Sequence, residues 1–291
     1  MSLTDAETRT RAARLSHLLV QFRILIPSPD PDALAEGISR FQREQGLLED
    51  GIAGPATLWE LQQPLLRVKH QLVRLPVRPP PGVDSEAQIV LRADVATQYE
   101  KLQAALEEKG GSMTSAGGLR RLSSGSNANR STTSHHYWAG AFDLALPSGF
   151  FAPRTDPFVV ERVGTGKGTW RVWARASKGE SRSIEATYWA GWNGGKDLTR
   201  EVHGHFIDFT ALAQSYGFYP IGPRRSFTRS TSRSYGGAEW WHFQYEAGLF
   251  PGVSQLGIEL QKIQGYSPDK IHRENPALWQ NARIIFRQSW F

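Results

Sequence analysis

The stretch SHHYWAGAFDLAL, Ser134–Leu146, places an acidic side chain inside an apolar run. If residues 141–146 form a β-strand, side chains alternate between its two faces, so Phe142 and the leucines share one face while Asp143 shares the other with two alanines. The bulky face can pack into a core, whereas the alanines leave room beside the carboxylate. Because an unpaired carboxylate is costly to bury, this stretch predicts a strand that lines a polar site.

Two histidines extend this site into a candidate metal centre. His136 lies seven positions before Asp143, and small residues between them permit a turn. In GGAEWWHFQY, His242 is the candidate third ligand, and Glu239 precedes it by three positions. A regular strand would place Glu239 and His242 on opposite faces, so we expect a bend near the glycine pair. Two histidines and one aspartate leave a coordination position open, as catalytic zinc sites do, and Glu239 is then the candidate general base.

These residues, in this order and with these inner spacings, resemble the M15 family of zinc peptidases. This is the D-alanyl-D-alanine carboxypeptidase and dipeptidase group, which shares its fold core with Hedgehog signalling domains. The family pattern S-x-H-x6-D is matched by Ser134, His136 and Asp143, and E-x-x-H is matched by Glu239 and His242. The resemblance implies that the two histidines and the aspartate bind Zn²⁺ and that Glu239 is the general base.

The resemblance also implies an arginine that binds the substrate carboxylate or the developing oxyanion after a TS-G strand. In TSAGGLRRL, Arg120 is a better match than Arg121. A guanidinium fork can hold a terminal carboxylate through two bonds. Shortly after the first ligand, Ala139 stands where the family usually has glycine, and Gly140 follows it.

The segment SSGSNANRSTTS leads directly into His136 and is rich in serine and asparagine. This composition predicts a loop, which either contacts substrate or is only solvated. Asn127, Asn129 and Arg130 are the candidate substrate contacts in it, and Ser134 joins them through the family pattern.

Three other histidines are weaker candidates for metal ligands. His135 is expected to point away from the site along an extended backbone. His203 and His205, in HGHF, share one strand face, which can bind metal. Because the sequence places no acidic partner near them, we expect a structural or substrate-contact role for this pair.

The N-terminal part carries a second pattern, FQ…GL…DG…GP.T…L, between Phe41 and Leu61. Apolar residues at helical spacing precede and accompany it, and Pro55 marks a helix start. The pattern resembles the peptidoglycan-binding domain 1 family, which implies a three-helix module that binds the cell wall. The alternative is a helical bundle that caps the next domain without binding sugar.

A proline-rich stretch, LPVRPPPGVDSEAQ, separates this module from the rest and predicts a linker. The predicted organisation is therefore a small all-α module at 1–66, a linker at 67–92 and a zinc peptidase domain at 93–291. In the large domain, we expect one helix capped by Asp94 and ended by Gly110, and another from Asp208 to Gly217. Strands and helices do not alternate regularly, which favours an α+β fold with an antiparallel sheet, and the resemblance implies a Hedgehog/DD-peptidase-like domain.

Charge and amino-acid composition limit the classes of partner that we expect this chain to bind. The net charge is +6; residues 1–66 carry 6 basic and 9 acidic side chains, and residues 67–92 carry 5 and 2, so 93–291 holds the excess. No basic run with interleaved aromatic residues is typical of a nucleic-acid site, so we expect no nucleic-acid partner. The chain has no cysteine, no 18-residue apolar window for a membrane span and no clear signal peptide. A monomer is expected.

Together these features predict a zinc-dependent peptidase that hydrolyses peptidoglycan stem peptides. The activity is either D-Ala-D-Ala carboxypeptidase-like or endopeptidase, and the sequence leaves the bond open. The expected location is the cell wall, periplasm or extracellular space, with a phage lysin as a further origin. The alternative is a non-catalytic cell-wall-binding protein that keeps a structural zinc site.

Overall fold

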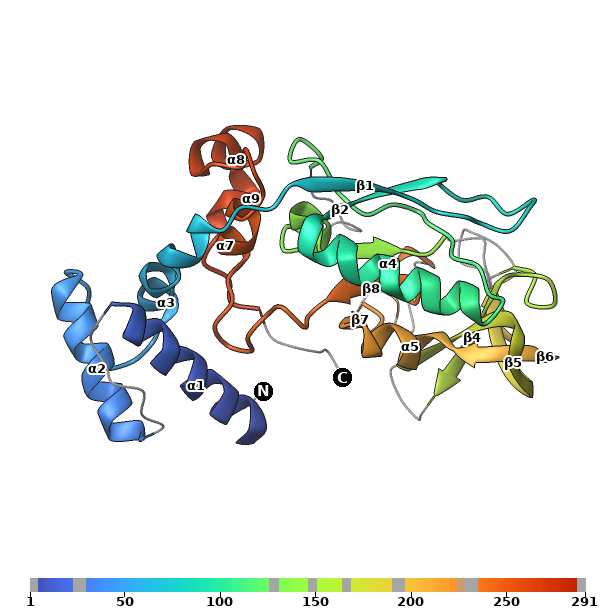
Figure 1. The fold of residues 1–291 in the computed structure, drawn as a ribbon, viewed down its shortest axis with the longest axis horizontal. Helices are drawn as coiled ribbons and strands as arrows, with labels where there is room; N and C mark the ends of the chain where they lie inside the picture. Colours follow the sequence, from blue (N-terminus) through green and yellow to red (C-terminus); the bar gives the residue numbers. More distant parts are fainter. Residues whose placement is uncertain are drawn as a thin grey trace. The chain divides into compact units, whose positions relative to one another are not determined.

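The structure is a computed structural model that describes residues 5–22, 30–125, 131–145, 151–163, 169–189, 197–224, 227 and 235–286. The chain forms two compact units. Unit 1 comprises Met1–Gln71, Leu122–Gly125 and Gly248–Gln288, and unit 2 comprises Leu72–Arg121, Ser126–Ala247 and Ser289–Phe291. The helices of unit 1 come from both ends of the sequence, as the blue and red ribbons of Figure 1 show.

Unit 1 is helical. Its elements are α1 (Asp5–Gln21), α2 (Pro31–Glu44), α3 (Pro55–Leu61), η1 (Gln63–Arg67), α7 (Leu256–Gln261), α8 (Pro268–Glu274) and α9 (Pro276–Gln280). Its core contains Leu18, Leu19, Phe41, Leu58 and Val253, all at most 1% exposed. The helices expected from 1–66 are therefore present, and Pro55 begins one of them.

The FQ…DG…GP.T pattern of unit 1 has a clear structural reason. The Gln42 side chain donates to Asp50 Oδ1 at 2.7 Å, to the Ile52 carbonyl and to Thr57 Oγ1. Its carbonyl oxygen accepts from the backbone nitrogens of Asp50 and Gly51. Gly51 itself has a φ of +67°, a region that favours glycine. The pattern therefore specifies the loop between α2 and α3.

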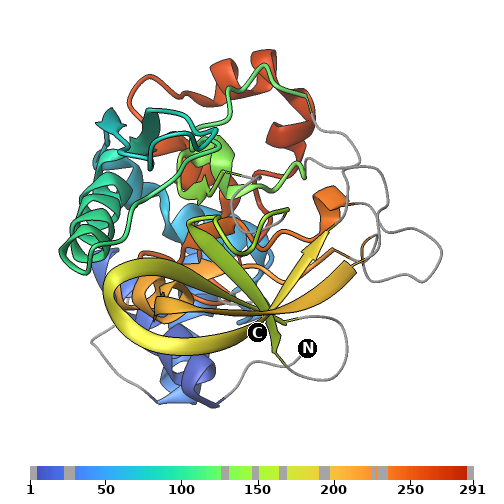
Figure 2. The same ribbon diagram turned by 90° about the vertical axis from the view of Figure 1, so that its right-hand side faces the viewer.

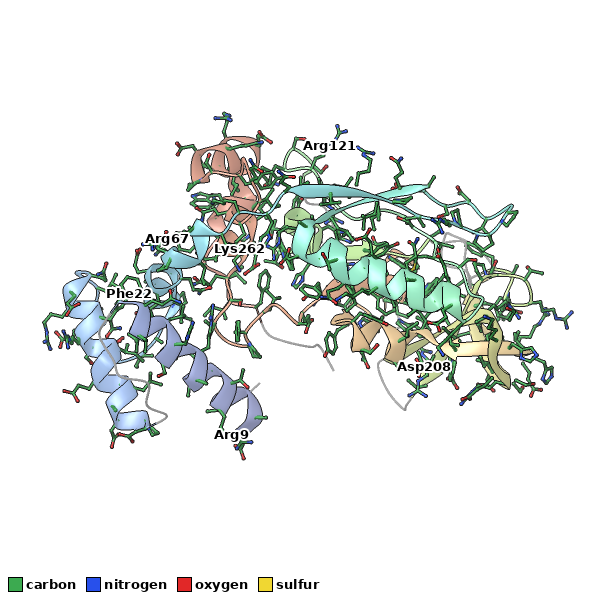
Figure 3. The ribbon with its side chains drawn as sticks, viewed as in Figure 1. Arg9, Phe22, Arg67, Arg121, Asp208 and Lys262 are labelled. Atoms are coloured by element: carbon green, nitrogen blue, oxygen red, sulfur yellow. The ribbon has the colours of Figure 1, made fainter. Side chains whose placement is uncertain are left out.

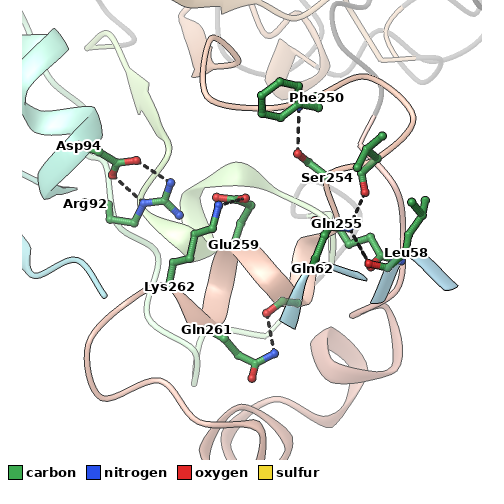
Figure 4. A network of polar contacts seen from close by, with 12 residues as sticks. Leu58, Gln62, Arg92, Asp94, Phe250, Ser254, Gln255, Glu259, Gln261 and Lys262 are labelled. Carbon is green, nitrogen blue, oxygen red and sulfur yellow. Dashed lines mark hydrogen bonds and ion pairs between the residues drawn. The ribbon is translucent and has the colours of Figure 1, made fainter. Parts of the chain in front are cut away.

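The C-terminal segment of unit 1 is bonded to these N-terminal helices. Gln62 Nε2 donates to the Leu58 and Val253 carbonyls at 3.1 and 2.8 Å, and the first of these bonds lies in the network of Figure 4. Gln255 Nε2 donates to the Pro55 carbonyl at 2.8 Å. The segment Gly248–Gln288 thus belongs to the helical unit by contact, although the sequence predicts it to be part of the large domain.

Unit 2 begins inside the predicted linker. There, β1 (Leu72–Pro76) pairs antiparallel with β2 (Gln88–Arg92), and α4 (Ala93–Glu108) follows directly. Asp94 does not cap α4, contrary to expectation, because its carboxylate pairs with Arg92 at 2.7 and 2.8 Å. The expected end of the helix is confirmed, since Gly110 has a φ of +74°.

The sheet that bears the candidate site has the order β3–β8–β7, with β3 (Ala141–Asp143), β8 (His242–Tyr245) and β7 (Phe218–Pro220) antiparallel. Phe142 projects into an aromatic core, where its ring lies 5.1 Å from both Tyr99 and Phe218. Phe142 and Leu144 are fully buried, which confirms the expected apolar face. Leu146 lies outside the described residues.

A second sheet of unit 2 has the order β4–β5–β6, with β4 (Phe158–Val163), β5 (Thr169–Trp189) and β6 (Asp197–Asp208). The long strand β5 pairs with β6 along most of its length and curls through a wide arc, drawn in yellow in Figure 2. Asp208 caps α5 (Phe209–Ser215) through a 2.9 Å bond from Ala211 N, and Gly217 follows with a φ of +83°, as the sequence predicts.

The architecture is thus mixed α+β, with N-terminal helices and several small antiparallel sheets. The predicted fold class is confirmed at this level. Among the described residues, no helix is long and apolar enough to span a membrane.

Candidate metal centre

Three side chains from separate parts of unit 2 converge at one point. His136 lies on η2 (His135–Trp138), Asp143 ends β3 and His242 begins β8. His136 Nε2 lies 3.2 Å from Asp143 Oδ2 and 3.1 Å from His242 Nδ1. His242 Nδ1 lies 2.9 Å from Asp143 Oδ1. Both histidines are about 5% exposed, and the aspartate side chain is 22% exposed.

Strand register brings two of the three together. Asp143 and His242 are directly opposite each other in the antiparallel β3–β8 pair. Side chains at opposed positions project from the same face, so the carboxylate and the imidazole meet without any distortion of the strands. The two predicted ligands are therefore placed by an ordinary ladder.

A tight turn brings in the third. Ser134 Oγ caps η2 by accepting from His136 N, and Ala139 ends it with a φ of +55°. Left-handed backbone favours glycine, which is the residue the family resemblance leads one to expect at Ala139. The Arg120 amide donates to the His136 carbonyl at 2.9 Å and fixes the turn from the other side.

The orientation of the His136 ring is also fixed. Its Nδ1–H donates to the Gly118 carbonyl at 2.5 Å. When His136 is neutral, its other ring nitrogen, Nε2, carries a lone pair that it can present to a metal ion. When His136 is protonated, Nε2–H faces Asp143 Oδ2 at 3.2 Å instead. A side chain at Gly118 would come within 2.5 Å of the Val90 carbonyl, so only glycine fits beside this bond. Metal-binding histidines are typically oriented by such a carbonyl.

The charges at the centre favour an ionised carboxylate. Burial acts to raise the pKa of Asp143, but the charge of His136 and hydrogen bonds from both histidines outweigh it, so the pKa lies well below its ordinary value. Burial lowers the pKa of His242, and the bond to Asp143 together with the charges of Asp143 and Glu239 outweighs that effect and raises it. The group is thus built around one negative charge.

Glu239 lies in the turn that leads into β8. The His242 amide donates to the Glu239 carbonyl at 3.1 Å, and Glu239 has a φ of +57°. The expected bend is therefore present, and the charge of Glu239 acts to raise the pKa of His242. The Glu239 side chain is 7% exposed and forms an ion pair with Arg224 through Oε1.

The two candidate arginines differ in their surroundings. The charge of Arg120 acts to lower the pKa of His242, and its guanidinium lies 5.3 Å from the Tyr137 ring centroid. Arg121 is exposed, and its side chain extends away from the ribbon in Figure 3. Of the two, Arg120 is the residue whose charge reaches the centre.

The other residues predicted to contact substrate or metal lie at different places in the structure. Ser134 has the capping bond described above, while Asn127, Asn129 and Arg130 lie outside the described residues. His135 is buried with its ring 5.0 Å from that of Trp138 and is not part of the triad. Burial lowers its pKa well below the ordinary value. His203 and His205 are exposed on β6, and His205 Nδ1 bonds to the Gly179 carbonyl at 3.0 Å.

The donor set fits a small divalent metal ion. Within the part of the chain that the structure describes, His136, Asp143 and His242 are the one group of three such side chains that can hold a metal, with ligand atoms within 4.8 Å of one another. Two donors about 2.05 Å from a tetrahedral ion lie about 3.3 Å apart. The observed separations are close to this, at 3.1 Å between the two histidines, 2.9 Å from His242 to Asp143 Oδ1 and 3.2 Å from His136 to Asp143 Oδ2. Imidazole and carboxylate are both common zinc ligands.

Three groups that hold His136 or the Glu239 turn were not identified from the sequence. They are the Gly118 carbonyl and the side chains of Arg224 and Trp170, the last of which donates to the Ala238 carbonyl at 2.6 Å. The GG pair in TSAGGLRRL was a usable signal for close backbone approach. No spacing rule singles out Arg224 or Trp170, because both reach Glu239 and its turn through tertiary packing.

Comparisons of the chain with protein-family models, with curated proteins and with solved structures found no match.

Proposed function

We propose that this protein is a zinc-dependent peptidase that hydrolyses peptidoglycan stem peptides. The observation that carries the proposal is the buried His136–Asp143–His242 triad, beside which Glu239 and Arg120 both act on the pKa of His242. The site therefore has three candidate metal ligands, a candidate general base and a candidate cationic side chain that could bind a substrate carboxylate or an oxyanion. The residue pattern that resembles M15 peptidases supports the same assignment.

In the proposed mechanism, His136, Asp143 and His242 hold Zn²⁺. The ion, when bound, supplies Lewis-acid polarisation of a carbonyl and a lowered pKa for water. Glu239 accepts the proton of the attacking water at its carboxylate and delivers it to the departing amine. Arg120 binds either the substrate's terminal carboxylate or the oxyanion that develops during attack. Gly118 keeps His136 in the tautomer that this arrangement needs.

The N-terminal helical module is proposed to bind peptidoglycan and to raise the local concentration of stem peptides. Its support is the pattern from Phe41 to Leu61 that resembles a wall-binding family. The proposed place of action is accordingly the bacterial cell wall.

The test is a digest of purified muropeptides by the zinc-loaded protein, analysed by mass spectrometry, beside a sample treated with a chelator. Zinc-dependent fragments are expected, and their masses identify the bond as a terminal D-Ala-D-Ala linkage or an internal one. Absence of cleavage across several stem-peptide chemistries, with zinc bound and wall binding retained, would replace this proposal with a non-catalytic wall-binding protein.

A further inference from the structure

The turn that carries Glu239 has a conformation that a glutamate adopts at a cost. Among the described non-glycine residues, Glu239 is one of two with a positive φ, at +57°. Residues held in such regions are strained, and they persist where the surrounding structure determines their conformation. Something in unit 2 must therefore hold this turn in place.

Arg224 holds one side of the turn by two separate groups. Its backbone amide donates to the Gly237 carbonyl at 2.8 Å, and its guanidinium Nε pairs with Glu239 Oε1. A single residue thus binds both the backbone and the carboxylate of the same short segment. The Arg224 side chain is 29% exposed and that of Glu239 is 7% exposed, so the pair is largely screened from water.

Trp170 holds the other side. This residue lies in β5, and its indole Nε1–H donates to the Ala238 carbonyl at 2.6 Å. Trp170 is 3% exposed, and its ring centroid lies 5.9 Å from that of Trp189. Ala238 is fully buried. A second sheet, β4–β5–β6, therefore fixes the peptide unit that immediately precedes Glu239.

We propose that Arg224 and Trp170 are positioning residues that hold the Glu239 turn in its left-handed conformation and fix the direction of its carboxylate. The link to catalysis rests on the proposed function, in which Glu239 is the base. Neither residue contributes a ligand atom to the triad. Their loss therefore displaces the carboxylate while leaving the three metal ligands in place.

Two matched pairs of variants test this proposal. Trp170→Phe removes the N–H donor and keeps a ring, and Trp173→Phe is its control. Trp173 also lies in β5, is similarly buried and also donates its N–H, but to Glu161 at 2.8 Å. Arg224→Gln removes the ion pair, and Arg171→Gln, from an Arg171–Asp208 pair, is its control. Arg224→Lys tests rescue by a retained charge.

The first measurement is hydrogen exchange of the His242 amide, which reports the bond to the Glu239 carbonyl without any need for turnover. The exchange rate is expected to rise about tenfold or more in Trp170→Phe and Arg224→Gln, and to stay within about twofold of the parent in both controls. Zinc affinity is expected to remain within about threefold of the parent in all variants. Unchanged exchange in both test variants overturns the proposal, as does equal acceleration in the controls.

The second measurement is steady-state cleavage of a stem peptide. A misplaced base lowers kcat by about 10- to 100-fold with little change in KM, and Arg224→Lys is expected to recover part of that loss. An unchanged kcat in variants with accelerated exchange overturns the catalytic part. If the parent protein itself does not cleave, the proposed function fails, and the exchange data alone then decide whether these residues hold the turn.

Discussion

Asp143 lies directly opposite His242 in the β3–β8 register, with its Oδ1 2.9 Å from His242 Nδ1. This relationship explains how an acidic residue is tolerated at the end of an apolar strand. The carboxylate is flanked by two imidazoles, and these hold its pKa below the ordinary range despite burial. A divalent cation bound at the same point would neutralise its charge further.

Removal of a triad ligand is expected to abolish metal binding. His242→Ala and Asp143→Ala each delete one of the three donors. Loss of a hydrogen bond that supports a ligand lowers metal affinity about 10- to 100-fold, and the loss of a ligand itself is expected to lower zinc affinity by more than that. Isothermal titration with zinc and metal analysis of the purified protein measure this. His203→Ala, which alters an exposed histidine of β6, serves as the control, and an equal loss there would contradict the assignment.

Arg120 is expected to contribute to substrate binding or to the transition state. Arg120→Ala removes charge-assisted hydrogen bonds, so kcat/KM is expected to fall about 10- to 100-fold. Arg121→Ala is the matched control, and its kcat/KM is expected to be unchanged because the side chain is exposed. A loss confined to substrates with a free terminal carboxylate would assign Arg120 to that group, and a loss on all substrates would assign it to the oxyanion. Equal effects of the two substitutions would contradict a specific role.

Tyr99 gives a pH-dependent prediction for stability. Burial raises the pKa of its hydroxyl, so the folded protein keeps this proton to a higher pH than the unfolded chain does. The unfolded chain ionises first, above a pH of about 10, and the free energy of unfolding falls as pH rises beyond that value. Urea unfolding at pH 8 and pH 11 measures this. The free energy of unfolding is expected to fall less between these two pH values in Tyr99→Phe than in the parent protein.

The same substitution should not destabilise the fold at neutral pH. The Tyr99 hydroxyl is buried and has no hydrogen-bond partner among the described residues, so its removal leaves no donor or acceptor unsatisfied. Tyr219→Phe, at a partly exposed tyrosine, is the control. A marked loss of stability in Tyr99→Phe at pH 8 would show that the hydroxyl has a partner.

Gln42 is expected to be a main stabilising residue of the α2–α3 loop. Gln42→Ala removes bonds to Asp50, Gly51, Ile52 and Thr57 and deprives the buried Thr57 hydroxyl of this partner, so we expect a loss of about 2–4 kcal/mol in the free energy of unfolding. Chemical unfolding of the full chain measures it. Gln45→Ala alters an exposed glutamine one turn later, and a similar loss there would indicate a general effect on α2.

Local patterns predicted which three side chains converge in the candidate metal centre. Alternation in residues 141–145 gave the buried face of Phe142 and the polar face of Asp143, and inner spacing singled out His136 and His242. These signals are local because strand alternation and tight turns depend on a few adjacent residues. The predicted helix ends at Gly110 and Gly217 follow from the same kind of information.

Long-range packing could not be predicted in this way. Gln255 bonds to Pro55 across 200 positions, and it joins residues after Gly248 to the N-terminal helices. Trp170 reaches Ala238 across 68 positions. Such pairs depend on the shapes of whole elements, which no short pattern encodes. The division into domains at 1–66, 67–92 and 93–291 stays a prediction. The segment predicted as a linker contains the β1–β2 pair.

The most direct test of the proposed chemistry is the turnover of a stem peptide by Glu239→Gln at matched zinc occupancy. The substitution keeps the size of the side chain and removes its ability to accept a proton, whereas the three metal ligands are unchanged. Zinc affinity is expected to remain within about threefold of the parent, and kcat is expected to fall by about 10²- to 10⁴-fold. A zinc-loaded Glu239→Gln protein that cleaves as fast as the parent would contradict the assignment of Glu239 as the base.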